Sequence, residues 1–340
     1  MTSKYHPAIK ALTPLDFPWP VDDPFLFCAY HQDIYPRANE EFGPDADLSG
    51  RNLGSDFIKK DGYRMYHGET VPGFPAHPHC GFETLTIVEE GFVDHTDSLG
   101  ATARYGKGDF QWLTTGSGIL HSEMFPLLNK TELNPLELFQ IWLNLPARSK
   151  ESPAAFNMYW AEKFTHFDIV NSSHLKVFTG QLGHYRASIT PPQASYASSE
   201  KADLTVAVLT LAKGEQFNLP KAHNLHALRS LYFYMGNSVK IGDVVIDKPM
   251  KISLDSSFDQ LPIIAIDGEV KLLLLQGVPL YEPIVQHGPF VALTKDRLYE
   301  KINEYRRTEF GGWTLPTSAP VHGEITKRFA KRGEETEWPS

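Results

Sequence analysis

Two stretches decide how this chain is interpreted: Pro75-Ala-His-Pro-His79-Cys-Gly-Phe-Glu83 and Gly116-Ser-Gly-Ile-Leu-His121-Ser-Glu123. In an extended strand, residues two apart project from the same face. His77 and His79 therefore share a face, and Pro78 favours extension because it disfavours α geometry at His77. His121 and Glu123 share a face in the same way. We expect facing strands to bring three imidazoles and at least one carboxylate to a common point.

The residue spacing leaves the identity of the acidic ligand open. Glu83 has the same parity as His79, so Glu83 and Glu123 are both candidates. Nitrogen and oxygen ligands without sulfur suit iron, manganese, nickel, copper or zinc. Three histidines and one glutamate on an octahedral ion leave two positions open, for a bidentate substrate or for a substrate and dioxygen. A closed structural zinc site usually contains cysteines, so the pattern favours a working metal.

We do not expect most of the other histidines to bind a metal. A single His-x-His is unremarkable in a chain with fourteen histidines. We interpret His95, His223, His226 and His287 as structural or surface residues, and the spacing of three between His223 and His226 does not place both on one strand face. Cys80 has the wrong parity to join the histidines, and we expect it to pack outside the site.

The chain around these stretches has a β pattern. Glu83-Thr-Leu-Thr-Ile-Val88 alternates, with Glu83 and Leu85 on one face and Thr84 and Thr86 on the other. Short strands separated by turns predict a sandwich or barrel rather than an α/β fold. The pattern resumes after the polar stretch 146–153, so we predict a second all-β domain without the metal-site spacing.

One helix stands out near the end of the chain. It is expected over 294–307, with Thr294 as its cap and an apolar face of Leu298, Ile302 and Tyr305. The final residues are polar and read as a loosely held tail. We predict a metal-binding domain over 1–150, a metal-free domain over 151–290, and the helix and tail over 291–340.

Composition narrows the class of protein. The 340 residues carry a net charge of -9, which gives no basic footprint for nucleic acid. Cys28 and Cys80 are too few for a disulfide framework. The N-terminus lacks the apolar core of a signal peptide, and no apolar run reaches the ~18 residues that a membrane span needs. We expect a soluble cytoplasmic protein. If the source is eukaryotic, a nuclear pool is an alternative.

Several ordered motifs resemble the signature of the pirin family of bicupins. They are His77-Pro-His-Cys-Gly-Phe-Glu-Thr84, His95-Thr-Asp-Ser-Leu-Gly100, Gly108-Asp-Phe-Gln-Trp112, Gly116 to Glu123, Gln140-Ile-Trp-Leu-Asn-Leu-Pro146 and Glu282-Pro-Ile-Val-Gln-His-Gly-Pro-Phe290. The resemblance covers most of the chain in order. It departs at Cys80, where the family often has arginine.

The resemblance implies two cupin barrels of the jelly-roll type, with a metal ion in the first only. It implies the ligands His77, His79, His121 and Glu123, and Fe(II) as the usual ion, with Mn, Ni, Cu or Zn as alternatives. Glu83 then becomes a group that orients a ligand histidine.

The resemblance also implies a function. Several pirins resemble quercetin dioxygenases, which open flavonols with O2 and release carbon monoxide. In that reading the metal binds the substrate hydroxyl, and Glu123 or Glu83 takes its proton. The expected partners are a small aromatic substrate and O2. The alternative is an iron-dependent, redox-sensing regulator that binds a transcription factor or a metabolic enzyme.

Overall fold

The computed structural model describes residues 6–323 and 326–339. The chain forms two compact units that are not consecutive segments. One combines Ala29–Ala161 with the chain from Glu282 onward, and the other combines the chain up to Cys28 with Glu162–Tyr281. We call the first the histidine unit, because it contains the predicted metal site, and the second the companion unit. This division differs from the predicted consecutive domains at both ends of the chain.

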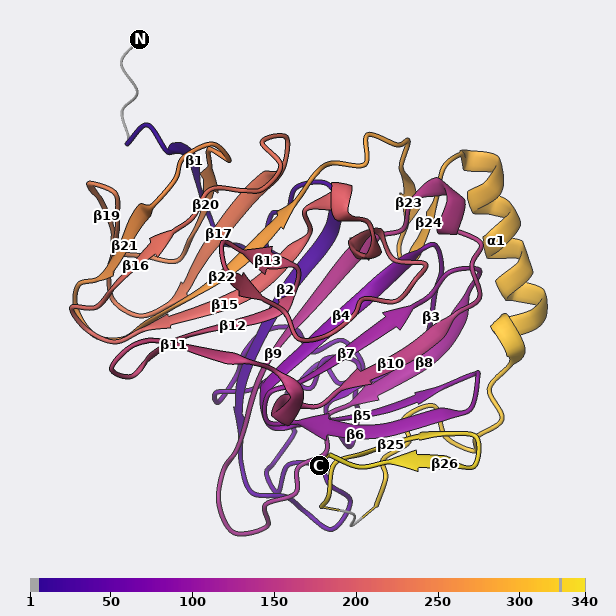
Figure 1. Cartoon of the computed structure of the whole chain (residues 1–340). Coiled ribbons are helices and arrows are strands. Elements are labelled where there is room, and N and C mark those ends of the chain that lie inside the picture. The colour runs from indigo at the N-terminus through magenta and orange to yellow at the C-terminus, as the bar shows by residue number, and fades with distance from the viewer. Residues whose placement is uncertain (1–5, 324–325, 340) are drawn as a thin grey trace. The chain divides into compact units, whose positions relative to one another are not determined.

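Two sheets build the histidine unit (Figure 1). The first has the order β10 (Ala155–Tyr159), β7 (Asp109–Thr114), β4 (Phe82–Glu90), β9 (Asn134–Asn144), β2 (Phe25–Tyr35). The second has the order β26 (Glu335–Glu337), β25 (Phe329–Arg332), β6 (Ala101–Gly106), β5 (Phe92–Asp97), β8 (Ile119–Met124), β3 (Gly73–His79). Both sheets contribute buried side chains to one apolar core, among them Val88 and Leu113 from the first and Val93 and Ile119 from the second. The unit is therefore a β-sandwich packed around a shared interior.

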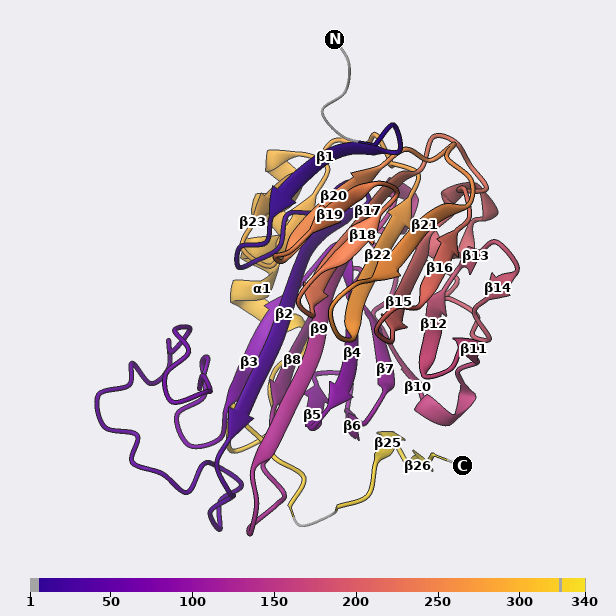
Figure 2. The ribbon, with the colours of Figure 1, turned by 90° about the vertical axis from the view of Figure 1, so that its left-hand side faces the viewer.

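The companion unit repeats this plan (Figure 2). Its larger sheet has the order β1 (Ile9–Pro14), β20 (Met250–Leu254), β17 (Leu228–Met235), β22 (Val270–Gly277), β15 (Thr205–Leu211), β12 (Ser173–Thr179), β11 (His166–Val170). Its smaller sheet has the order β16 (Gln216–Leu219), β21 (Leu261–Ala265), β18 (Val239–Ile241), β19 (Val244–Ile246). The predicted all-β class is confirmed in both units.

Short elements complete the chain. Two hairpins join β13 (Gln181–Leu182) to β14 (Tyr185–Arg186) and β23 (Val285–His287) to β24 (Phe290–Ala292). Single 3-10 turns occur at Ala147–Ser149, Ala161–Lys163, Tyr196–Ser198, Glu200–Ala202 and Glu309–Gly311.

The predicted helix is confirmed as α1 (Lys295–Thr308), whose cap residue Thr294 accepts a hydrogen bond from the Arg297 backbone N–H. Its predicted apolar face packs on a small cluster with Cys80 and Phe310. No helix among the described residues is long and apolar enough to cross a membrane.

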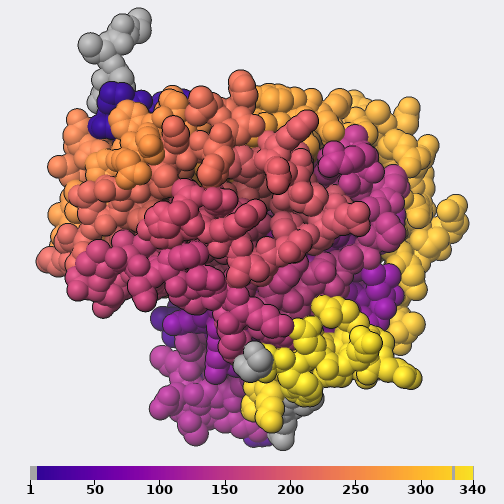
Figure 3. Space-filling model, viewed as in Figure 1, coloured from indigo at the N-terminus to yellow at the C-terminus, as the bar shows by residue number. Residues whose placement is uncertain are grey.

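The C-terminal segment is more ordered than its polar sequence predicts. β25 pairs with β6 and β26 pairs with β25, which extends the six-stranded sheet. Figure 3 shows this segment in yellow at the surface. Phe329 and Ala330 are buried. These two apolar residues anchor the segment, and we did not predict this because the residues around them are mostly charged.

Candidate metal centre

Two neighbouring strands of the six-stranded sheet position the predicted ligands. β3 and β8 pair antiparallel, with His77 opposite His121 and Phe74 opposite Glu123. Side chains of directly opposed residues project from the same face of a sheet. The register therefore places the two predicted ligand pairs on one face. The register shifts between Phe74 and His77, which marks an irregularity in β3 just before the first histidine.

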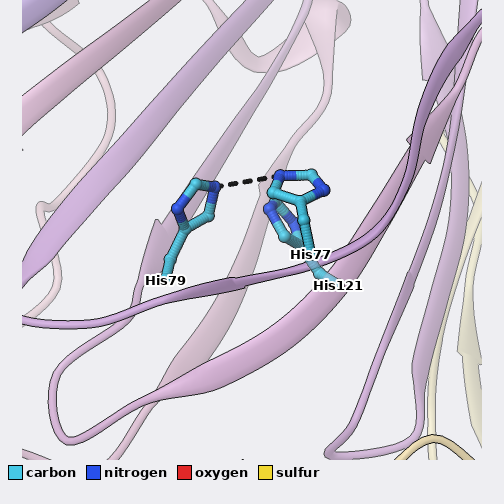
Figure 4. Close-up of side chains that lie close together, drawn as sticks. All are labelled: His77, His79 and His121. Atoms are coloured by element: carbon cyan, nitrogen blue, oxygen red, sulfur yellow. Dashed lines mark hydrogen bonds between the residues drawn. The ribbon is translucent and has the colours of Figure 1, made fainter. Parts of the chain in front are cut away.

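The three histidines converge (Figure 4). One ring nitrogen from each of His77, His79 and His121 lies within 4.8 Å of the others. The ring centroids of His77 and His121 are 4.5 Å apart, and His79 lies 4.7 Å from each of them. The Nε2 atoms of His77 and His79 are 3.1 Å apart. Among the described residues, this is the one group of three or more potential ligands close enough to hold a metal ion.

The state of these rings fits a metal ion. His79 and His121 are buried, and both nitrogens of His121 and Nδ1 of His79 have no hydrogen-bond partner among the described residues. Burial lowers the pKa of His77 to about 4 and the pKa values of His79 and His121 well below the ordinary value. Neutral imidazoles offer the lone pair that a metal requires. An ion would also satisfy polar atoms that are otherwise costly to bury.

Glu123 lies beside this cluster. Its Oε2 is 3.9 Å from Nε2 of His121. Its Oε1 accepts a hydrogen bond from Thr86 Oγ1, and its Oε2 accepts one from Gln140 Nε2, each at 3.2 Å. Burial raises the pKa of this carboxyl. Glu123 is therefore held close enough to act as the predicted fourth ligand, which stays a prediction.

Glu83 is not brought to the cluster. Its carboxylate accepts a hydrogen bond of 2.7 Å from Thr114, its directly opposed neighbour on β7. Thr86, which bonds Glu123, has the opposite parity on β4 and therefore faces the other side of the sheet. Between His79 and Glu83 the chain turns at Gly81, with a φ of 86°, and enters a different sheet. Counting parity through this turn placed Glu83 beside the histidines, and the structure gives that placement no support.

The polar environment of Glu123 continues to His95. Thr86 Oγ1 also lies 2.6 Å from Gln140 Oε1 and 3.4 Å from Gln111 Oε1, so these two oxygens and Glu123 share its single proton. Gln111 Nε2 lies 2.9 Å from Nδ1 of His95, whose Nε2 lies 3.0 Å from Asp97 Oδ2. His95, which we interpreted as a structural or surface residue, is buried and has a polar neighbour at each ring nitrogen.

The sequence motifs did not predict that three residues of this network lie beside the metal centre: Thr86, Gln111 and Gln140. The signal that could have found them is that each is a polar residue at an alternate position of a strand whose other face is apolar. In this unit the polar face of β4 is the one that points to the histidines.

Aromatic rings surround the same place. The His79 ring lies 5.1 Å from Phe82 and 5.3 Å from Trp142, and these two aromatics are 4.5 Å apart. Phe74 lies 6.2 Å from His77. His77 is only half-buried, so solvent reaches the cluster on that side.

Cys80 packs away from the histidines, as its parity predicts. Its Sγ approaches the carbonyl oxygens of Gly116 and Ser117 at 3.5 and 3.6 Å. Burial raises the pKa of the thiol to about 12. It packs with Phe290 and Phe310, so it supports the turns that flank the ligands.

Comparison with known proteins identifies the family. The Pirin family model matches residues 37–143, and the model of the Pirin C-terminal cupin domain matches residues 206–311. The chain belongs to the pirin family. Both pirin domains are cupins in the architecture described above, which confirms the predicted fold class.

Two curated relatives extend over most of this pirin. A Pseudomonas aeruginosa protein named "Putative quercetin 2,3-dioxygenase" is 31% identical over 239 residues, covering 70% of this chain and 79% of its own. Pirin-like protein 2 of Arabidopsis thaliana is 33% identical, covering 68% of this chain and 69% of its own.

A solved structure shares the fold. The crystal structure of a quercetin 2,3-dioxygenase from Acinetobacter baumannii superimposes with a TM-score of 0.70, at 24% sequence identity. It covers 90% of this chain and 98% of its own.

Proposed function

We propose that this pirin is a metal-dependent dioxygenase that opens flavonols such as quercetin with O2. The observation that carries the proposal is the three-histidine cluster, in which His79 and His121 are buried and His77 is half-buried, with Glu123 at its side. The names of the Pseudomonas aeruginosa relative and of a Vibrio cholerae relative that is 31% identical support the substrate class.

The predicted ligand residues determine which metal ions the site would bind. His77, His79, His121 and Glu123 would bind Fe(II) in our proposal, and their nitrogen and oxygen atoms equally suit Mn, Ni, Cu or Zn. When bound, such an ion supplies a Lewis acid and, for iron, a redox-active centre.

The chain's own residues bind and deprotonate the substrate in this proposal. Glu123 is held by Thr86 and Gln140, so its carboxylate has a fixed position from which to take the proton of a flavonol hydroxyl. Trp142, which is half-buried beside His79, offers a face for the planar rings of a flavonol, and the buried ring of Phe82 packs against it. Glu83 bonds Thr114 and takes no part.

Oxygen uptake tests the proposal. Full-length protein is loaded with Fe(II) without air, and oxygen consumption is followed with quercetin for the wild type and for His79→Ala. His226→Ala is the control, because this exposed histidine lies in the companion unit and its ring has no part in the cluster. We expect uptake in the wild type and the control, and loss to background in His79→Ala.

Metal-loaded wild type that consumes no oxygen with quercetin or related flavonols would contradict the dioxygenase proposal. Partner capture that depends on the metal state would then support the alternative, an iron-dependent regulator of a transcription factor or metabolic enzyme.

A further inference from the structure

A buried arginine in the companion unit has two side-chain nitrogen atoms, with three of its five N–H donors, that lack partners among the described residues. Arg229 lies near the start of β17 and is 2% exposed. Its Nη1 donates to the Pro220 carbonyl at 2.8 Å. Its Nε and Nη2 have no hydrogen-bond partner among the described residues. A buried guanidinium in this state is costly, because hydration is lost and nothing replaces it.

Arg229 points into the interior of the companion unit. Leu231 and Phe233 have the same parity on β17 and belong to the buried core. Directly opposite Arg229 on β22 is Gln276. The Oε1 of Gln276 is also buried without a partner among the described residues, while its Nε2 donates to the Asp203 carbonyl at 3.3 Å. An unused donor pair and an unused acceptor therefore belong to directly opposed residues of the same sheet.

The position corresponds to the ligand-binding end of the histidine unit. β4 and β17 each carry a register irregularity, between Val88 and Glu90 and between Phe233 and Met235. Counting back four residues from Val88 and from Phe233 gives Thr84 and Arg229.

The partner strands agree with this correspondence. Thr84 pairs with Trp142, whose ring lies 5.3 Å from His79, whereas Arg229 pairs with Gln276. The companion unit thus carries the cation Arg229 where the histidine unit has Thr84, and the amide Gln276 where it has Trp142 beside His79.

The neighbouring carboxylates do not neutralise Arg229. Asp203 and Asp259 act on it only at a distance, since neither forms an ion pair within 4.0 Å with this residue, and Asp203 Oδ2 accepts from the Asn224 backbone N–H. Burial lowers the pKa of Arg229 to about 10, so the guanidinium stays charged at neutral pH. The two acids set a negative field that disfavours an anion of higher charge.

We propose that the companion unit of this pirin binds a small monocarboxylate anion at Arg229. The Nε and Nη2 donors lie on one edge of the planar guanidinium and match the two oxygens of a carboxylate. The Oε1 of Gln276 accepts from a hydroxyl group on the same ligand, which favours a 2-hydroxy acid over a plain carboxylic acid. The site takes no metal, because the inward side chains of β16 and β21 are Phe217, Leu219, Leu261 and Ile263.

Thermal unfolding of the full-length protein tests the site. Melting is followed against sodium glycolate, sodium acetate, sodium chloride and inorganic phosphate at constant ionic strength. We expect a saturable rise of several degrees with glycolate, a smaller rise with acetate, and none with chloride or phosphate. The rise should vanish in Arg229→Gln and persist in Arg297→Gln, which changes an exposed arginine on α1.

Two results would overturn the proposal. The first is an equal glycolate response in the wild type and Arg229→Gln, and the second is no specific response in the wild type, which would mean that water satisfies the guanidinium. A stronger response to phosphate would contradict the assigned ligand class. If Arg229→Gln does not fold, the Nε–H resonance of Arg229 in the wild type gives the same answer, since a bound carboxylate must shift it and glycolate would otherwise leave it unchanged.

Discussion

A substitution of Thr86 tests the metal centre while leaving the four predicted metal-binding side chains unchanged. The Thr86 hydroxyl donates to Glu123, so Thr86→Val removes one of the two hydrogen bonds that hold this carboxylate while keeping the side-chain shape. We expect metal affinity to fall by ~10–100-fold, as for other groups that orient ligands. Competition with a chelator measures it.

Thr84→Val is the matched control for this substitution. Thr84 lies on the same face of β4, and its hydroxyl is buried without a hydrogen-bond partner among the described residues. We expect its metal affinity to stay at the wild-type value. Equal losses in the two variants would show that Thr86 acts only through packing.

His31 makes the stability of the protein depend on pH. Its Nδ1 lies 2.8 Å from the Tyr66 hydroxyl, which itself donates to Asp33. Burial, and to a lesser degree Arg64, lowers the pKa of His31 to about 3. The unfolded chain binds a proton below pH ~6.5 and the folded chain does not, so the free energy of unfolding decreases as pH falls from ~6.5 towards ~3.

His31→Gln removes this contribution. The wild type should lose up to a few kcal/mol more than His31→Gln over that range, measured by urea unfolding at several pH values. Parallel curves for the two proteins would show that His31 is not held neutral.

Residue types and spacing were enough to predict the three-histidine cluster, whereas the choice of Glu123 over Glu83 rested on the family resemblance, and the surroundings of the cluster were not predicted. His77, His79 and His121 lie within regular strands, where the two-residue period holds, and the structure brings them together. Glu83 lies beyond the turn at Gly81, where that period fails. Thr86 and Gln140 contribute through contacts between strands that no local pattern contains.

At the scale of elements, the turn between β3 and β4 depends on one glycine. Gly81 has a φ of 86°, and a Cβ there would lie 1.9 Å from the Val291 carbonyl oxygen on β24. Gly100 has the same φ of 86°, and a Cβ there would meet nothing within 4 Å. We expect Gly100→Ala to cost about 1–2 kcal/mol through backbone strain alone. Gly81→Ala should cost several kcal/mol and reduce metal binding, because His79 immediately precedes the turn.

Urea unfolding and metal content of the two glycine variants provide the comparison. Equal destabilisation by Gly81→Ala and Gly100→Ala would contradict a close approach of β24 to this turn.

For the whole molecule, the sequence predicted the fold class. It did not predict which distant segments of the chain combine to form each unit. The spacing of short strands and turns predicts all-β domains. The pairing of β1 with β20 joins residues at opposite ends of the companion unit's sequence, and periodicity carries no information about partners so far apart. The same holds for β25, which pairs with β6.

Metal removal should affect the two units unequally. Because a ligand protects the structure to which it binds, chelation should speed backbone hydrogen exchange in β3 and β8. Exchange in β15 and β22 of the companion unit should not change. Mass spectrometry of exchanged peptides makes the comparison, and uniform acceleration across both units would contradict a metal site confined to the histidine unit.

Elemental analysis of the purified full-length protein tests whether each chain holds one metal ion at His77, His79 and His121. We expect one transition-metal ion per chain in the wild type and none in His79→Ala, with unchanged circular dichroism. Equal metal content in the two proteins, or a wild type that binds no transition metal when one is supplied, would contradict it.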